Sequence, residues 1–506
     1  MKNTNLWALR VNVLDENNDA KTLYFSDVPY IDADHNYYED RIQKPALIQA
    51  SPSDGGVLRV FSSPSIGEFE LIRENDDIQN STGNLNHLSD YAFDNGDFEL
   101  IYVDEFGVEN IYMTGKIESM HDNDSSLFLT VKSTAEVLTR PHTATKYAGS
   151  NSLPAGVEGV TADIKGNIKP KVFGKVTNAT PVFVNTARSI YQFSDRPTCT
   201  VNAVYDKGSP YTLGATYTQA NFSTFETTVP TTGTFNRCMG FVKLGTTPLG
   251  TVTGDCTDST TNAGDVFEAI LSELTPPIAF DNTSEFDTDS RYILNQIGEV
   301  GIYVNSETST AQLLDLIAAS CGAHWYFIGD VIHARLTQLA TTSVFDLTES
   351  EIVSFERSGI GLGENNLPIE SVVIDYAKVQ TVQQETELSA TVSSAKKAIL
   401  SQQFRKVTVS DAAVKTRHPL AKQLKIESCL NTESDANAVA TRLLNLTKVR
   451  CDTVKITAIV YSLPVFDVGS GVTIYYARNG YEGRLMTVVG FELNTKEKTI
   501  ILEVIG

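Results

Sequence analysis

The stretch FDNGDFELIYVDEFGVENIYMTGKIESMHDNDSSLFLTVK, residues 93–132, determines the predicted fold because it recurs near the end of the chain. Residues 466–505 read FDVGSGVTIYYARNGYEGRLMTVVGFELNTKEKTIILEVI, and a constant offset of 373 aligns the two stretches without a gap. Eleven of the 40 aligned positions are identical, whereas unrelated sequences of ordinary composition share roughly two or three. The identical pairs include Phe93/Phe466, Asp94/Asp467, Gly96/Gly469, Gly107/Gly480, Met113/Met486 and Thr114/Thr487.

Both stretches have the pattern of a three-stranded meander. Each begins with a turn ending in glycine, has a second glycine between β-branched and aromatic runs, and continues through a Met-Thr strand into a polar turn and a last strand. We therefore expect two related antiparallel β modules, barrel-like, at the two ends of one chain. Two unrelated meanders that resemble each other by chance are the alternative.

The composition is that of a large globular protein. The chain has 506 residues, 41% of them hydrophobic and 20% charged, and this length predicts three or four domains. The N-terminal stretch reaches Asp15 and Glu16 before any apolar run is long enough for a signal peptide. No stretch approaches the roughly 20 apolar residues of a membrane span. We expect a protein that is made and folded in a cytoplasm.

The net charge of -22 argues against tight binding to nucleic acid, which requires clustered lysines and arginines that displace counterions from phosphates. It is compatible with a position near DNA, because an acidic wall repels a polyanion and lets it slide past without sticking. We expect that any DNA near this protein passes without specific binding.

The sequence predicts a mainly β protein with a smaller α+β part in the middle. Two helices are expected in the α+β part: Asp265–Leu274, which stops at Pro276, and Ser309–Cys321, which begins with a capping box and ends at Gly322. The predicted divisions are a first β module at 1–140, a linker at 141–160, a β-rich middle domain at 161–262, a small α+β domain at 263–350, and a second β module at 351–506 that includes a polar exposed arm at about 378–403 and a helix at about 434–448.

No metal or cofactor site is expected. Cys321 and His324 form a C-x-x-H pair, but without a second pair nearby they fit a helix end that runs into a core strand. The acidic turns lack the ligand ladder of a calcium loop, and we interpret their acids as solvated; these are Asp76, Asp77, Asp122 and Asp124. The six cysteines are scattered without CxxC pairing and are expected to remain thiols, a Cys238–Cys256 disulfide being the alternative.

No catalytic constellation is present in the sequence. The glycine run Gly359–Gly363 imitates a nucleotide loop, but it lacks the Lys-Ser/Thr of that loop and a strand-to-helix setting. The chain has no HExxH, Gly-x-Ser-x-Gly or Walker motif, and its seven histidines are scattered. We therefore expect that the protein is not an enzyme.

Several segments, taken in their order along the chain, resemble the central hub proteins of tailed-bacteriophage tail tips and baseplates. The resemblance covers nearly the whole chain and is carried by these stretches: Gly67–Leu71 with the acidic turn that follows, Lys169–Asn178, Val204–Gly208, Gly240–Gly254, and the closing meander from Asp467 to Gly506.

This resemblance implies a homotrimer in which two related β domains of each chain alternate around a ring. Six near-equivalent positions would let a sixfold tail tube or distal tail protein join a threefold spike or central fibre, and the ring would line the DNA channel. The implied partners also include the tape measure protein, and the implied location is the virion tail tip, assembled in the host cytoplasm. The middle domains would project from the ring.

Two other functions remain open at this stage. A receptor- or glycan-binding tail protein fits the 20 tyrosines and the threonine-rich stretch 209–262, although such a protein needs no internal duplication. A cell-wall hydrolase would need a pair of carboxylates at a fixed separation, which the sequence does not reveal among 62 acidic residues.

Overall fold

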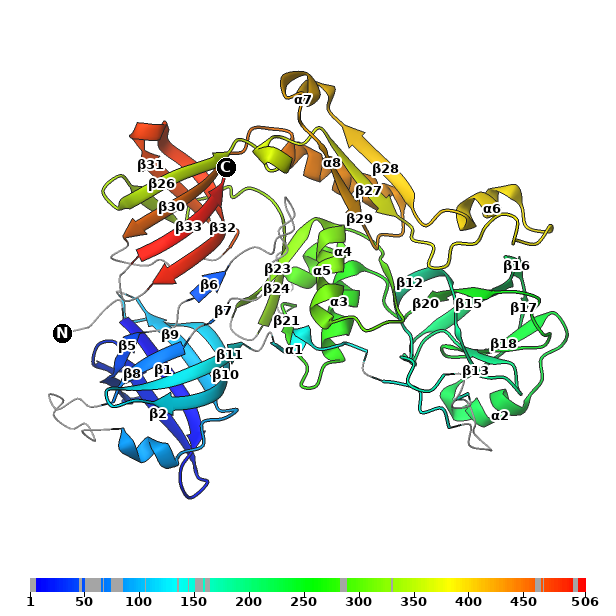
Figure 1. Cartoon of the computed structure of the whole chain (residues 1–506), viewed down its shortest axis with the longest axis horizontal. Helices are drawn as coiled ribbons and strands as arrows, with labels where there is room; N and C mark the ends of the chain where they lie inside the picture. The colour runs from blue at the N-terminus through cyan, green and yellow to red at the C-terminus, as the bar shows by residue number, and fades with distance from the viewer. Residues whose placement is uncertain are drawn as a thin grey trace.

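The computed structural model shows a mainly β protein with separate sheets, as the sequence predicts (Figure 1). None of the helices among the described residues is long and apolar enough to cross a lipid bilayer. The structure describes residues 6–44, 48–50, 65–66, 68–73, 85–104, 106–133, 136–143, 145–150, 158–159, 164–282, 289–328, 331–459, 466, 468–494 and 499–506.

The N-terminal sheet has nine strands in the order β3-β4-β2-β1-β9-β10-β11-β8-β5. Phe69, Phe98 and Leu100 are among its fully buried side chains, because alternate residues of the strands point inward. Its strands are β1 Leu6–Leu14, β2 Ala20–Ser26, β3 Tyr30–Ile31, β4 Tyr37–Asp40, β5 Ile42–Lys44, β8 Glu68–Ile72, β9 Asp97–Val103, β10 Glu109–Asp122 and β11 Ser126–Ser133, with the short helix η1 Asn86–Asp90 before β9.

The C-terminal sheet has the order β25-β31-β32-β33-β30-β26 and is drawn in red, orange and yellow-green in Figure 1. Val472, Ile474, Leu502 and Val504 are fully buried in it. Its strands are β25 Phe345–Thr348, β26 Ile352–Gly359, β30 Thr453–Ile459, β31 Gly471–Tyr476, β32 Tyr481–Asn494 and β33 Thr499–Ile505, with the short helix η4 Ala477–Asn479 between β31 and β32.

The β-rich middle part contains two five-stranded sheets that share a core around Phe193, Val204 and Phe235. One sheet has the order β16-β15-β20-β12-β22 and the other β13-β14-β19-β18-β17. The elements are β12 Lys171–Ala179, β13 Val182–Asn185, β14 Ile190–Gln192, β15 Thr200–Asp206, β16 Ser209–Pro210, β17 Thr212–Tyr217, η2 Gln219–Asn221, α2 Phe222–Thr227, β18 Thr234–Cys238, β19 Phe241–Leu244, β20 Val252–Thr257 and β22 Gly301–Val304.

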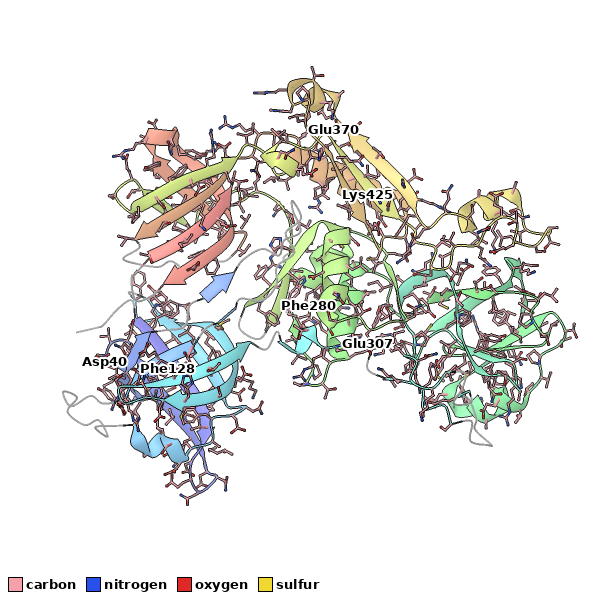
Figure 2. All side chains as sticks on the ribbon, viewed as in Figure 1. Asp40, Phe128, Phe280, Glu307, Glu370 and Lys425 are labelled. Carbon is pink, nitrogen blue, oxygen red and sulfur yellow. The ribbon has the colours of Figure 1, made fainter. Side chains whose placement is uncertain are left out.

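The α+β part is built on helices that pack against two small sheets. Its elements are α1 Glu136–Thr139, α3 Ala263–Ser272, β21 Ala279–Phe280, α4 Ser290–Asn295, α5 Thr310–Cys321, β23 Ala323–Ile328, β24 Val331–Leu336, η3 Glu364–Asn366, β27 Ser371–Tyr376, α6 Ser394–Leu400, β28 Arg405–Ser410, α7 Ala412–Arg417, β29 Gln423–Glu427 and α8 Glu433–Thr447. Figure 2 labels Phe280 beside the helices, and Glu370 and Lys425 near the β27–β29 sheet.

The predicted helices are confirmed to within two residues at their ends. α5 begins with the expected capping box, in which the Ser309 hydroxyl accepts from the Gln312 backbone N–H, and it ends at Gly322 in the left-handed conformation. Helix α8 also forms as predicted, but it lies in one cluster with α3, α5 and the sheet β27-β28-β29 rather than with the C-terminal sheet. The stretch 360–449 is therefore an insertion whose small sheet and helix α8 join the α+β part. An amphipathic helix alone does not reveal which neighbour covers its apolar face, and this explains the difference.

The segment 378–403, for which the sequence predicts an exposed arm, lies against the β-rich middle part. Val379, Leu388 and Leu400 form a small buried cluster. The backbone N–H of Thr381 donates to Asn178 O at 3.1 Å, and Lys396 Nζ lies 3.5 Å from the centre of the Tyr205 ring. The few apolar residues of this polar segment are thus sufficient to fix it in place.

Candidate functional site: the two related sheets

Six strands of each terminal sheet correspond in both chain order and sheet order. We call β1, β5, β8, β9, β10 and β11 the first module, and β25, β26, β30, β31, β32 and β33 the second module. When the six strands of each module are numbered along the chain, both sheets have the same order, 1-4-5-6-3-2. The pairs that correspond are antiparallel in both modules, except that β1 is antiparallel to β9 whereas β25 is parallel to β31.

The two long central strands also contain bulges at corresponding places. In β10 the bulged residues are Tyr112, opposite β9, and Glu118, opposite β11. In β32 they are Gly483, opposite β31, and Val489, opposite β33. Because a β-bulge is a specific local deviation that bends a strand, the same spacing between two bulges in each module strengthens the correspondence beyond strand order.

The register corrects the gapless sequence alignment. At the turn before the meander, the backbone N–H of Asn95 donates to Ile117 O at 2.9 Å and that of Gly469 donates to Val488 O at 2.8 Å. Both turn residues have positive φ, 64° for Asn95 and 91° for Gly469. The structure therefore equates Asn95, not Gly96, with Gly469.

The Met-Thr pairs are not equivalent either. With both bulges matched, Met113 corresponds to Arg484 and Met486 corresponds to Gly115, so that Thr114 and Thr487 also separate. The strand pairings give the reason. Leu100 corresponds to Ile474 at an offset of 374, Met113 to Arg484 at an offset of 371, and Val131 to Val504 at an offset of 373. A single offset of 373 therefore matches only the third strands in register.

Other predicted positions do correspond. Leu129 and Leu502, and Val131 and Val504, are core residues of the third strand in both modules. Gly107 and Gly480 share a left-handed backbone with φ of 78° and 77° in the hairpin turn. Phe93 and Phe466 are both buried, but the register that equates Asn95 with Gly469 places them one position apart. Asp94 is exposed, and Asp467 lies outside the described residues.

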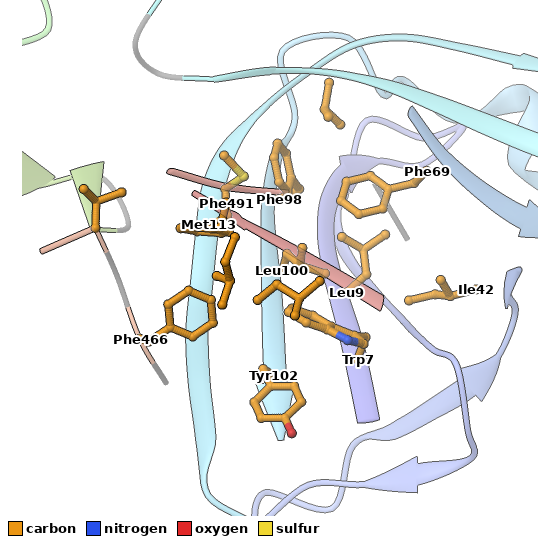
Figure 3. Packing of buried hydrophobic residues seen from close by; sticks show 14 of the residues in the cluster. Trp7, Leu9, Ile42, Phe69, Phe98, Leu100, Tyr102, Met113, Phe466 and Phe491 are labelled. Carbon is orange, nitrogen blue, oxygen red and sulfur yellow. The ribbon is translucent and has the colours of Figure 1, made fainter. Parts of the chain in front are cut away.

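The two modules touch each other within the chain. The short strand β6 (Ile48–Ala50), which lies between β5 and β8 in sequence and pairs with β7 (Ser65–Ile66), pairs with the second module at 491–493 of β32. Figure 3 shows Phe466 and Phe491 close to Met113 of the first module. The ring centres of Phe466 and Phe491 are 5.0 Å apart, and all three residues belong to one buried cluster that spans both modules.

The first module contains an arginine surrounded by acids. Arg10 Nη1 lies 3.3 Å from Glu99 Oε2, Arg10 Nη2 lies 3.8 Å from Asp32 Oδ2, and Arg10 also pairs with Glu109. The Tyr30 hydroxyl donates to Glu109 at 3.0 Å, and burial together with this carboxylate raises the pKa of Tyr30 to about 12.

The second module contains the reverse arrangement, an acid surrounded by arginines. The carboxylate of Asp452 accepts hydrogen bonds at 2.8 Å from Arg450 Nε, Arg484 Nη1 and the Tyr481 hydroxyl, and Arg357 Nη1 lies 3.9 Å away. Burial alone would raise the pKa of Asp452. The hydrogen bonds from Arg450 and Tyr481 and the charges of the arginines outweigh burial, so the pKa is lowered.

The chemical motifs of the sequence have ordinary structural settings. Cys321 is buried at the end of α5, and burial lowers the pKa of His324 to about 4 at the start of β23. His324 and residues 361–363 line a cavity of about 190 Å³, whereas Cys321 belongs to the hydrophobic core of the α+β part. Among the described residues, no three His, Cys, Asp or Glu side chains are placed to hold a metal ion, and the six cysteines are free thiols.

Comparison with known proteins gives matches among solved structures. No protein-family profile and no curated protein matches this chain. A 43 kDa prophage tail protein from Shewanella oneidensis is 8% identical, with 99% of this chain and 98% of that chain covered and a TM-score of 0.40. A prophage tail protein from Listeria monocytogenes is 8% identical, with 99% and 94% covered and a TM-score of 0.39. The phage P2 baseplate in its activated conformation contains a chain that is 8% identical, with 99% and 98% covered and a TM-score of 0.21.

Sequence reasoning missed the two charge clusters. The pairing of Arg10 with acids 22 to 99 residues away, and of Asp452 with Arg357 and Arg484, depends on which strands become neighbours. The sequence signal was the short run Arg450-Cys451-Asp452 before a predicted strand, which by itself does not indicate a cluster.

Proposed function

We propose that this protein is a structural hub of a phage tail tip or baseplate, located in the virion, and that it works as a homotrimeric ring rather than as an enzyme. The observation that carries the proposal is the duplicated module: six strands in the same chain order, the same sheet order and with matching bulges, twice in one chain. The proposal explains why a single chain would contain two such sheets.

The physical argument concerns symmetry. A homotrimer of a chain with one module offers three equivalent positions, but a chain with two related modules offers six similar ones. A ring of this kind matches a sixfold tail tube or distal tail protein on one side and a threefold spike or central fibre on the other. The two modules need similar shapes for this purpose, not identical sequences.

The contact between the modules supports this arrangement. Neighbours in a ring must touch, and in this chain β6 of the first module region pairs with β32 of the second. Phe466 and Phe491 fill the cluster that both modules share. The burial of these aromatic rings contributes on the order of 2–3 kcal/mol each, which holds the modules as neighbours before other chains join.

The charge distribution supports a role as a conduit. Residues 6–133 contain 24 acidic and 8 basic residues. This stretch therefore has a net charge of -16, out of -22 for the whole chain. We propose that part of this acidity faces the lumen, so that the genome and the tape measure protein pass without sticking. The partners and assembly in the host cytoplasm are parts of the same proposal.

The decisive experiment is the mass and shape of the purified chain, alone and with its tail neighbours. We expect three times the 55.3 kDa chain mass by native mass spectrometry, and a threefold ring with six similar lobes by electron microscopy. A chain that stays monomeric or dimeric at micromolar concentration and with its neighbours would rule out the hub. A trimer with a basic lumen would rule out only the conduit.

A further inference from the structure

On the surface of the second module, three arginines gather around a single buried aspartate. We call Arg357, Arg450 and Arg484, gathered around Asp452, the arginine cluster. The side chains of Arg450, Arg357 and Arg484 are 56%, 46% and 32% exposed, whereas Asp452 is fully buried. Three guanidinium groups thus surround one internal carboxylate, and Arg484 also donates to Gly506 O, so that the cluster presents a net positive charge to solvent.

The rest of the chain makes this surface unusual. Residues 6–133, which contain the first module with its loops and edge strands, have a net charge of -16, and Arg10 in this stretch is surrounded by three acids. The stretches 345–359 and 450–506, which form the second module, have 10 acidic and 7 basic residues and are therefore close to neutral. Two first modules repel each other, but a first module and the arginine cluster attract.

The position of the cluster excludes the first module of the same chain as its occupant. The first module region contacts β32 at 491–493, whereas Arg484 lies seven residues earlier on the same strand, roughly 23 Å away along an extended strand. Arg484 Nη2 donates to Gly506 O, and in Figure 1 the C-terminus lies on the side of the second module that faces away from the first.

We propose that the arginine cluster receives the acidic first module of a second copy of this chain. This inference rests on the proposed function. Each second module would then have two different neighbours, its own first module at one end of β32 and another chain's first module at the arginine cluster. Electrostatic complementarity of this kind makes the modules alternate, because two first modules side by side would bring like charges together.

The first test reverses the charge of the cluster in the full chain. We expect Arg357→Glu with Arg450→Glu to weaken trimer formation at least about tenfold, measured by analytical ultracentrifugation across a concentration series. The matched control is Arg478→Glu, on the same module, 75% exposed and paired with Glu349, which should leave the trimer unchanged. Arg357→Gln with Arg450→Gln should give an intermediate loss. Thermal unfolding of each variant verifies that it folds.

The second test identifies the occupant. In the Arg450→Lys variant, carbodiimide should join the introduced amine to an aspartate or glutamate within residues 6–133, and a mixture of ¹⁵N-labelled and unlabelled chains should show that the crosslink joins two copies. Crosslinks confined to other regions would overturn this inference but not the proposed hub function. The same holds if both double variants form trimers as well as the wild-type chain does. Binding of a DNA oligonucleotide that the Arg357→Glu, Arg450→Glu variant loses, with the trimer unchanged, would also overturn it. Absence of any wild-type trimer would instead contradict the proposed function.

Discussion

Asn95 and Gly469 occupy the same left-handed turn position in the two modules, and each donates its backbone N–H to the central strand, Asn95 to Ile117 at 2.9 Å and Gly469 to Val488 at 2.8 Å. The central strand returns a bond in both cases, from Ile117 to Gly96 O and from Val488 to Ser470 O. Asparagine and glycine are the residues that adopt positive φ most readily, so two different residues satisfy one backbone requirement.

This relationship predicts the effect of substitutions at the turn. Gly469→Ala should destabilise the chain by about 1–2 kcal/mol, because its φ of 91° disfavours a side chain although a Cβ would meet only His324 Nε2, at 4.0 Å. Gly96→Ala should cost more, because a Cβ there would lie 2.3 Å from Asn12 O. Asn95→Gly is the matched control and should change stability by only about a few tenths of a kcal/mol. Urea denaturation measures all three, and equal losses for Asn95→Gly and Gly469→Ala would contradict the assignment.

A second prediction concerns the junction between the modules. Phe466→Ala should reduce the free energy of unfolding by about 3–5 kcal/mol, because it leaves a cavity in the cluster shared by both sheets. Phe106→Ala, at a side chain that is 74% exposed in the first module, is the control and should remain within about 0.5 kcal/mol of wild type. Similar small losses for both variants in chemical denaturation would show that the junction is not tightly packed.

A third prediction concerns Asp452. Asp452→Asn should destabilise the chain by about 2–3 kcal/mol at pH 7, because charged hydrogen bonds from Arg450 and Arg484 are lost. Since the pKa of Asp452 is lowered in the folded chain, its contribution is present above the ordinary carboxyl range and disappears as the pH falls below about 4. The stability difference between variant and wild type should therefore shrink in acid. Asp97→Asn, at an exposed carboxylate paired with Lys116, should have little effect at either pH.

A fourth prediction concerns His142, which lies between the α+β part and the β-rich part. Burial, followed by the charges of Lys171 and Arg196, lowers the pKa of His142 to about 4. Glu273 also faces the ring, at 3.3 Å from Nε2, and Thr310 Oγ1 lies 3.2 Å from Nδ1.

The direction of the pH effect follows from these neighbours. The unfolded histidine titrates near about 6.5, so the unfolded chain binds more protons and stability is complete above about pH 6.5 but falls toward about pH 4, by at most about 3 kcal/mol. Thermal unfolding across this range should show a shallower slope for His142→Gln than for wild type. Identical slopes would mean that the pKa of His142 is the same in the folded and unfolded chains, with Glu273 offsetting the effect of burial.

The sequence predicted the duplication, the helices and the β class, but it did not predict how the parts pack. Local signals were sufficient for α5, whose capping box and C-terminal Gly322 are both observed. The register of the repeat was not predictable, because the offset between the modules changes from strand to strand and because Met113/Met486 and Thr114/Thr487 match by composition rather than by position. The arginine cluster depends on how β26, β32 and the residues just before β30 come together, and such long-range proximity leaves no local pattern.

The two modules differ most in the segment that connects their second and third strands. Between its second and third strands, the first module has residues 45–67 with β6 and β7, whereas the second has residues 360–449 with a sheet and the helices α6, α7 and α8. Because both halves are translated as one polypeptide, they are always produced in equal amounts, and mutation can reshape one half while the other keeps its form. Tandem fusion thus frees each half to acquire its own attachments without upsetting the stoichiometry of the particle.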